Sequence, residues 1–416
     1  MTSPAEFSEP EVERLTGAAG LLLEAAQRLP VLRTLNWDRS YAEAFFASGE
    51  REPPQPEYEK IGPDPSLERI FAARALVSGA SPVHVWLKRV ADIAEETAAM
   101  LDCVGTALFH GHSRALYGSP SAPIASGSTT ALDLAWRLDG LLGEFNDAAL
   151  HLEPPETLSA EDVKARFDAA LPEYFGAHAP EVIVTPNVSA KAAAGPDYIK
   201  LRADAAFSDL DLDQLLQHEA LVHIATGMNG RAQTRFPILG ENHPGATRTQ
   251  EGLAVFAEFI SGALDPRRFK RLADRTIAID MAAEGADFLE LYGFFRERNA
   301  QDKPFEAFES ARRVVRGGLV NGGGPFTKDS VYLGGLIEVH HHLRAVVRAG
   351  DANFARRLFV GKIDLADLPA MDALLADGLI DPPTHLPPWA RDARFLLSHL
   401  AYSSFLNEID APASAA

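Results

Sequence analysis

Two histidines and a glutamate lie close together near the middle of the chain, as His218, Glu219 and His223 in the sequence H-E-A-L-V-H. A second glutamate, Glu251, follows within the sequence Q-E-G-L-A. Two imidazoles and one carboxylate are a common protein ligand set for a catalytic zinc ion, which keeps a fourth position open for water. The glutamate beside them is suited to act as a general base. The pattern therefore predicts a zinc metallohydrolase, and a peptidase in particular.

The two histidines are one residue further apart than in the common zinc-peptidase signature H-E-x-x-H, whose histidines share one face of a helix. A step of five residues in a regular α-helix turns about 500°, which leaves the two rings roughly 140° apart. Both rings can reach one metal only where the helix widens to i→i+5 hydrogen bonding. We therefore expect a π-bulge between His218 and His223. The alternative is that the spacing arises by chance.

The helix that carries the histidines is expected to begin at residue 208 or 209 and to end before the helix-stop pair 229–230. A second helix is expected to begin near Thr247, which places Glu251 in its first turn. There Glu251 could be the third metal ligand, or it could only complement the helix dipole. Glu258 lies further along the same face and could orient a histidine, although we expect a solvated surface glutamate.

The two motifs resemble those of a bacterial family named for a Q-E-G-L-A motif, the flavohemoglobin expression-modulating QEGLA motif proteins. That family is similar to the eukaryotic microtubule-associated tyrosine carboxypeptidases. Y-I-K-L-R at 198–202, N-G at 229–230 and F-T-K-D-S-V-Y-L at 326–333 extend the resemblance. It covers roughly residues 60–400, with the specific motifs between 180 and 340.

The resemblance implies one zinc ion per chain, bound by His218, His223 and Glu251, with Glu219 as the catalytic base. It also implies a zincin-like metallopeptidase core. The implied reaction is removal of a C-terminal residue from a protein or peptide, and in the eukaryotic family that residue is tyrosine.

In such a mechanism Glu219 takes a proton from the attacking water and delivers it to the leaving amine. The oxyanion needs a further donor, and Tyr332 is our candidate because a neutral phenol supplies one hydrogen bond. A carboxypeptidase also needs a cation for the terminal carboxylate of its substrate. The cations nearest to the motifs in the sequence are Arg248, Arg231 and Lys328. For each of these three, a purely structural role is the alternative.

The pattern of apolar residues is helical along most of the chain, so the fold class expected is α+β and predominantly α-helical. In the N-terminal third, helices are expected near 10–28, 66–78, 83–102 and 129–150. Two β-branched or aromatic segments, 181–186 and 198–202, are expected to form a small antiparallel sheet packed on the active-site helix. The second strand could bind an extended peptide by β-augmentation, or it could have no contact with substrate.

Length and composition are those of an ordinary globular protein with 416 residues, 46% hydrophobic and 23% charged. We expect a helical region over 1–175, a catalytic region over 176–405 and a disordered tail over 406–416. The net charge of −19, without a basic cluster, argues against nucleic-acid binding. The single cysteine fits a reducing compartment, and neither a signal peptide nor a membrane-spanning run is apparent. We therefore expect a cytoplasmic protein with no membrane partner.

Three classes of function fit these observations. The favoured one is a zinc carboxypeptidase that acts on the C-terminus of a peptide or protein. The second is a zinc hydrolase of a non-peptide amide, which needs the same ligands. The third is a non-catalytic regulatory or binding protein with a structural zinc. Glu219 weighs against the third class, because a structural zinc needs no general base and usually has four protein ligands.

Overall fold

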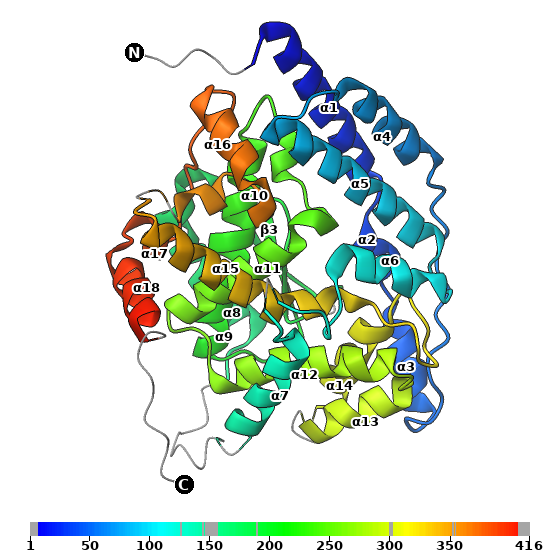
Figure 1. Cartoon of the computed structure of the whole chain (residues 1–416). Coiled ribbons are helices and arrows are strands. Elements are labelled where there is room, and N and C mark those ends of the chain that lie inside the picture. The colour runs from blue at the N-terminus through cyan, green and yellow to red at the C-terminus, as the bar shows by residue number, and fades with distance from the viewer. Residues whose placement is uncertain are drawn as a thin grey trace.

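The computed structural model describes residues 7–124, 127–143, 145, 157–188, 190–298, 303–351, 353 and 355–406. Helices account for most of this part of the chain, and one small sheet lies among them (Figure 1). The expectation of a predominantly helical α+β protein is confirmed. None of the described helices combines the length and the apolar character needed to cross a bilayer.

The N-terminal helices lie on one side of the molecule (Figure 1). They are α1 (Glu9–Gln27), α2 (Val31–Thr34), α3 (Arg39–Ala47), α4 (Asp64–Leu76), α5 (Pro82–Asp102) and α6 (Leu108–Tyr117). Three of the four expected helices appear within two residues of their predicted ends. The fourth, α7 (Ala131–Leu142), is shorter than the predicted 129–150, of which residues 144 and 146–150 lie outside the described part.

At the centre of the molecule, α11 (Pro244–Ile260) packs against α15 (Val331–Arg348) (Figure 1). The two backbones touch, because a Cβ atom on Gly252 would lie only 2.2 Å from the carbonyl carbon of Gly335. Glycine at both positions therefore permits an approach that any larger residue would prevent. Since Glu251 precedes Gly252, this contact holds the backbone of Glu251 close to α15.

Below this pair lie the helices of the middle of the chain, and the C-terminal helices cover another side (Figure 1). The first group is α12 (Pro266–Ala283), α13 (Phe288–Arg298) and α14 (Pro304–Val315), and the second is α16 (Leu368–Ala376), α17 (Pro388–Arg391) and α18 (Arg394–Leu406). The expected tail 406–416 lies outside the described residues, apart from Leu406, which ends α18.

The sheet has three strands in the order β1 (Glu181–Thr185), β3 (Tyr198–Arg202), β2 (Ala192–Ala194). The expectation of an antiparallel sheet is wrong for one pair, because β1 and β3 run parallel while β2 and β3 run antiparallel. The sheet packs between α8 (Ala160–Phe175) and the helix that carries the histidines, as expected. Since β3 is central and paired on both sides, the strand at the edge is β2, and 198–202 is not an edge strand.

Buried side chains of the described residues form three clusters: a large central one, one under the sheet and an aromatic one around Phe45 and Phe308. The central cluster joins helices on both sides of residue 175. Trp86 of α5, for example, lies 5.9 Å from Phe236, measured between ring centroids. The division into regions at residue 175 stays a prediction.

Candidate metal centre

The histidine-bearing helix is continuous but changes character along its length. It consists of α9 (Asp209–Leu215), a π-helical segment (Leu216–Ile224) and α10 (Ala225–Arg231). Ser208 caps it through a reciprocal hydrogen-bond pair with Asp211, so the predicted start is confirmed. The predicted stop before 229–230 is wrong, because both residues lie in α10.

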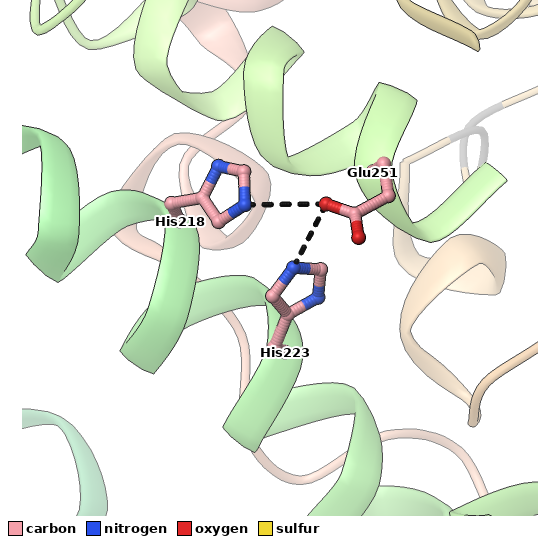
Figure 2. Close-up of side chains that lie close together, drawn as sticks. All are labelled: His218, His223 and Glu251. Carbon is pink, nitrogen blue, oxygen red and sulfur yellow. Dashed lines mark ion pairs between the residues drawn. The ribbon is translucent and has the colours of Figure 1, made fainter. Parts of the chain in front are cut away.

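The π-helical segment contains both histidines, as their spacing predicts. Its i→i+5 hydrogen bonds bring His218 and His223 above one another, with ring centroids 4.8 Å apart. The two Nε2 atoms point toward the same place (Figure 2).

Glu251 approaches the two histidines from α11 (Figure 2). This helix begins at Pro244 rather than near Thr247, so Glu251 lies at the end of the second turn and not in the first. A carboxylate at that depth gains little from the helix dipole, whose effect falls off within the first turn. Its position is therefore better explained by the histidines that it faces.

The three side chains have the geometry of a metal site. The Oε2 atom of Glu251 lies 3.4 Å from Nε2 of His218 and 3.5 Å from Nε2 of His223. Ligand atoms about 2.0–2.1 Å from zinc in a tetrahedral arrangement lie roughly 3.3–3.4 Å from one another. This Oε2 atom is buried and has no hydrogen-bond partner in the structure, as expected of an atom kept for a metal. Among the described residues, no second group of three such ligands is found.

Glu258 is fully buried, so the expectation of a surface glutamate is wrong. Its carboxylate accepts a hydrogen bond from Nδ1 of His218 at 2.6 Å. Arg268 donates two more, at 2.9 and 3.0 Å, and Gln214 donates a fourth at 3.2 Å. A carboxylate on Nδ1 fixes the histidine tautomer and leaves Nε2 free to bind a metal. Glu258 therefore orients the first ligand.

The pKa values of several ionisable groups in the site are shifted from their usual values. Burial lowers the pKa of His218, but the carboxylates of Glu251 and Glu258 outweigh burial and raise it to about 9. Burial raises the pKa of Glu251, yet Lys328 and the two histidines outweigh it and hold that pKa well below its usual value. In the same way, Arg268 and His218 lower the pKa of Glu258 to about 2. The carboxylates are thus ionised at neutral pH.

Glu219 and Tyr332 lie beside the three candidate ligands. An Oε2 atom of Glu219 accepts a hydrogen bond from the backbone N–H of Ala194, in β2, at 3.1 Å. The ring of Tyr332 lies 6.4 Å from that of His218, stacked at 23°. Burial, followed by the charge of Glu251, raises the pKa of Tyr332, so its phenol keeps its proton.

The three cations suggested by the sequence already have partners in the structure. Lys328 donates to Oε1 of Glu251 at 2.7 Å, which leaves the other oxygen facing the histidines. Arg248 donates to Glu338 at 3.1 Å and to a backbone carbonyl of α6. Arg231 donates to the backbone carbonyl of Pro196. Their role in binding substrate stays a prediction.

No sequence pattern pointed to Ala194, whose methyl side chain carries no chemistry. A signal for Glu258 did exist in its spacing of seven residues from Glu251, which is about two helical turns.

Comparison with known families agrees with this geometry. The profile of the microtubule-associated tyrosine carboxypeptidase family matches residues 43–408. The chain belongs to this family. The match includes the π-helical segment, the sheet, α11 and α15, which together carry the described site. A search of curated proteins finds no match.

Proposed function

We propose that this member of the tyrosine carboxypeptidase family is a zinc-dependent carboxypeptidase, with a zincin-like core, that removes a C-terminal residue from a peptide or protein. One observation carries the proposal. The ligand atoms of His218, His223 and Glu251 converge at nearly tetrahedral spacing, and the carboxylate of Glu219, next to His218 in the chain, accepts a hydrogen bond from Ala194.

The donor set suits zinc, which binds imidazole nitrogen and carboxylate oxygen and keeps one position open in catalytic sites. When bound, the ion supplies a Lewis acid and lowers the pKa of water toward 7. Glu258 holds His218 in place through a hydrogen bond from Nδ1, and Lys328 holds Glu251 in place through its Oε1 atom.

One side chain transfers the proton in the proposed reaction, and another stabilises the negative charge of the oxyanion. Glu219 takes a proton from the attacking water and passes it to the leaving amine. Its hydrogen bond from Ala194 keeps the carboxylate turned toward the sheet. Tyr332, neutral because of its burial, donates a hydrogen bond to the oxyanion.

The edge of β2 supports the binding of an extended peptide. The neighbours of this strand, Lys191 and Gly195, hydrogen-bond toward β3 at 2.8 Å each. Because successive residues of a strand point to opposite edges, the backbone groups of Ala192 and Ala194 face away from β3. One of them, the N–H of Ala194, reaches Glu219. A peptide added to this edge would pass over the catalytic glutamate.

The test uses zinc-loaded protein and a peptide library with varied C-termini, with products identified by mass spectrometry. We expect products shortened by one residue. Glu219→Gln is the matched variant, because it keeps the shape of the side chain but removes the proton-accepting charge. It should retain stoichiometric zinc by elemental analysis and lose on the order of 10²–10⁴ in rate.

Other results would favour the remaining classes of function. Cleavage of small amidated metabolites but of no peptide would indicate a different amide hydrolase. Zinc without turnover on any substrate would favour a binding protein. A Glu219→Gln variant with the wild-type rate would overturn the mechanism.

A further inference from the structure

Buried cations outnumber carboxylates around Tyr332. Arg313 makes a bidentate pair with Asp329, at 2.7 and 2.8 Å, and Lys328 pairs with Glu251. Two further arginines lie in the same place, Arg275 on α12 and Arg316 at the C-terminal end of α14. The chain as a whole carries a net charge of −19, so this surplus is local.

Neither of these two arginines has a hydrogen-bonding acceptor in the described part of the chain. The closest ion-pair contact of Arg275 is to Asp329 at 3.9 Å, and that carboxylate is already engaged by Arg313. Arg316 is 6% exposed, its Nε atom is buried without a partner, and its guanidinium lies 5.4 Å from the ring of Phe326. Buried guanidinium groups normally donate several hydrogen bonds, so this arrangement calls for an anion.

Electrostatics support the same conclusion. Burial and the neighbouring Arg313 lower the pKa of Arg275 to about 10, and with Arg312 they lower that of Arg316 to about 9. The cations therefore destabilise one another, and a bound carboxylate would relieve this repulsion.

Arg275 lies close to the candidate metal centre, and Arg316 is near enough to Tyr332 to interact with it electrostatically. Tyr332 stacks on His218, and the guanidinium of Arg275 lies 5.9 Å from the centroid of the Tyr332 ring. The side chain of Arg275 is 21% exposed, so a bound molecule can reach it.

The polarity of β2 indicates which end of a peptide would face these cations. A peptide paired antiparallel to β2, the more stable arrangement, would direct its C-terminus toward Lys191. At that end, the backbone N–H of Arg202 donates the ladder bond to the carbonyl of Lys191, and the guanidinium of Arg202 lies over the ring of Phe305, in α14. Arg202 and Arg316, which lies at the C-terminal end of this helix, both oppose the rise in the pKa of Glu309 that burial causes, so the two cations lie around the same helix.

We infer that Arg275 and Arg316 bind the terminal carboxylate of the peptide and so restrict cleavage to its last residue. This inference rests on the proposed function. It assigns to these two residues the role that sequence proximity suggested for Arg248, Arg231 and Lys328.

The experiment compares two peptides of the same sequence, one ending in a carboxylate and one in a carboxamide. The ratio of their kcat/KM values is measured for the wild-type protein, for Arg275→Gln and for Arg316→Gln. Arg248→Gln removes the same charge, breaks a pair with Glu338 and tests the competing assignment that proximity in the sequence suggested. Because both peptides are compared on one variant, partial misfolding lowers both values and leaves the ratio unchanged.

We expect the preference for the carboxylate to fall roughly 10- to 100-fold in the Arg275 and Arg316 variants, the loss typical of one charged hydrogen-bonding partner. Arg275→Lys and Arg316→Lys should restore part of it, and Arg248→Gln should keep it. An undiminished preference in both glutamine variants, or its loss in Arg248→Gln alone, would overturn the inference.

A second measurement separates this inference from the proposed function. The zinc-loaded Glu219→Gln protein is titrated with both peptides by calorimetry, without turnover. If the wild-type protein cleaves neither peptide, the proposed function fails. The inference then depends on binding: tighter binding of the carboxylate that is lost in Arg316→Gln supports it, and equal affinity overturns it.

Discussion

The candidate site has two sides with different charge balance. On the His218 side, around Glu258, each buried charge lies against an opposite charge. On the Arg316 side, around Arg275, cations exceed carboxylates. Glu258 accepts hydrogen bonds from His218, Arg268 and Gln214, which satisfies both of its oxygens. Arg275 and Arg316 have no such acceptor among the described residues. Balanced charges hold a rigid group in place, while unbalanced ones are suited to a partner that comes and goes. The first side therefore suits the metal that we propose, and the second suits the carboxylate of the proposed substrate.

The largest effect is expected when a candidate metal ligand is removed from the His218 side of the site, where the buried charges are paired. His223→Ala leaves two ligands, so the protein should lose most of its zinc and all measurable turnover, because three protein ligands hold a catalytic zinc. Elemental analysis and peptide hydrolysis measure the two losses. His112→Ala is the control, since His112 pairs with Glu96 on other helices. Undiminished zinc in His223→Ala would place the metal elsewhere.

Tyr332 lies at the boundary between the two sides. Tyr332→Phe removes only the phenol, so zinc content should persist while kcat falls on the order of 10²–10³, the typical cost of one oxyanion donor. Steady-state kinetics on a cleaved peptide provide the measurement. Tyr117→Phe removes another buried phenol and should change kcat little. Equal kcat values for Tyr332→Phe and the wild-type protein would exclude the phenol as the donor.

Removing a charge should lower the free energy of unfolding on the His218 side of the site and leave it unchanged or raise it on the Arg316 side. Glu258→Gln leaves Arg268 buried without its carboxylate and should lower the free energy of unfolding by about 3–5 kcal/mol. Arg316→Met replaces a buried cation that has no acceptor within the described part of the chain, so stability should stay equal or rise. Urea unfolding of the zinc-free proteins measures both. A large loss of stability in Arg316→Met would show that this cation has a structural role.

The smallest effect is expected in the number of protons that the protein releases when it binds zinc. With a pKa of about 9 in the zinc-free protein, His218 is protonated at pH 7. Nε2 can bind a metal only without its proton, so zinc binding at pH 7 should release about one proton from this residue, and fewer as the pH rises past 9. Calorimetry in two buffers of different ionisation enthalpy counts them. Glu258→Gln should release fewer protons at pH 7, because one carboxylate that raises the pKa is gone.

The sequence was most informative where the site is local. His218, Glu219 and His223 lie within one helical segment, so the assumption that both histidines bind one metal was enough to predict the π-helix that is observed. The start of that helix followed from Ser208 in the same way.

Features that depend on contacts between distant segments were not predictable. The burial of Glu258 depends on Arg268 from the next helix, and nothing local indicates that pairing. Strand β2 consists of three alanines, which have little preference for strands, and it forms because β3 offers an edge. Arg275 and Arg316 come from α12 and the end of α14, so proximity in the sequence favoured other cations.

The π-helical segment also bears on how a chain can tolerate an inserted residue. An additional residue in an ordinary α-helix rotates everything beyond it by about 100°. Here the wide segment takes up the residue that separates H-E-x-x-x-H from H-E-x-x-H, and α10 continues in a productive orientation. Its Asn229 still donates to the carbonyls of Phe359 and His385, both at 2.8 Å. The H-E-x-x-x-H and H-E-x-x-H patterns thus differ by one residue, and the rotation that this residue would cause is taken up within the π-helical segment.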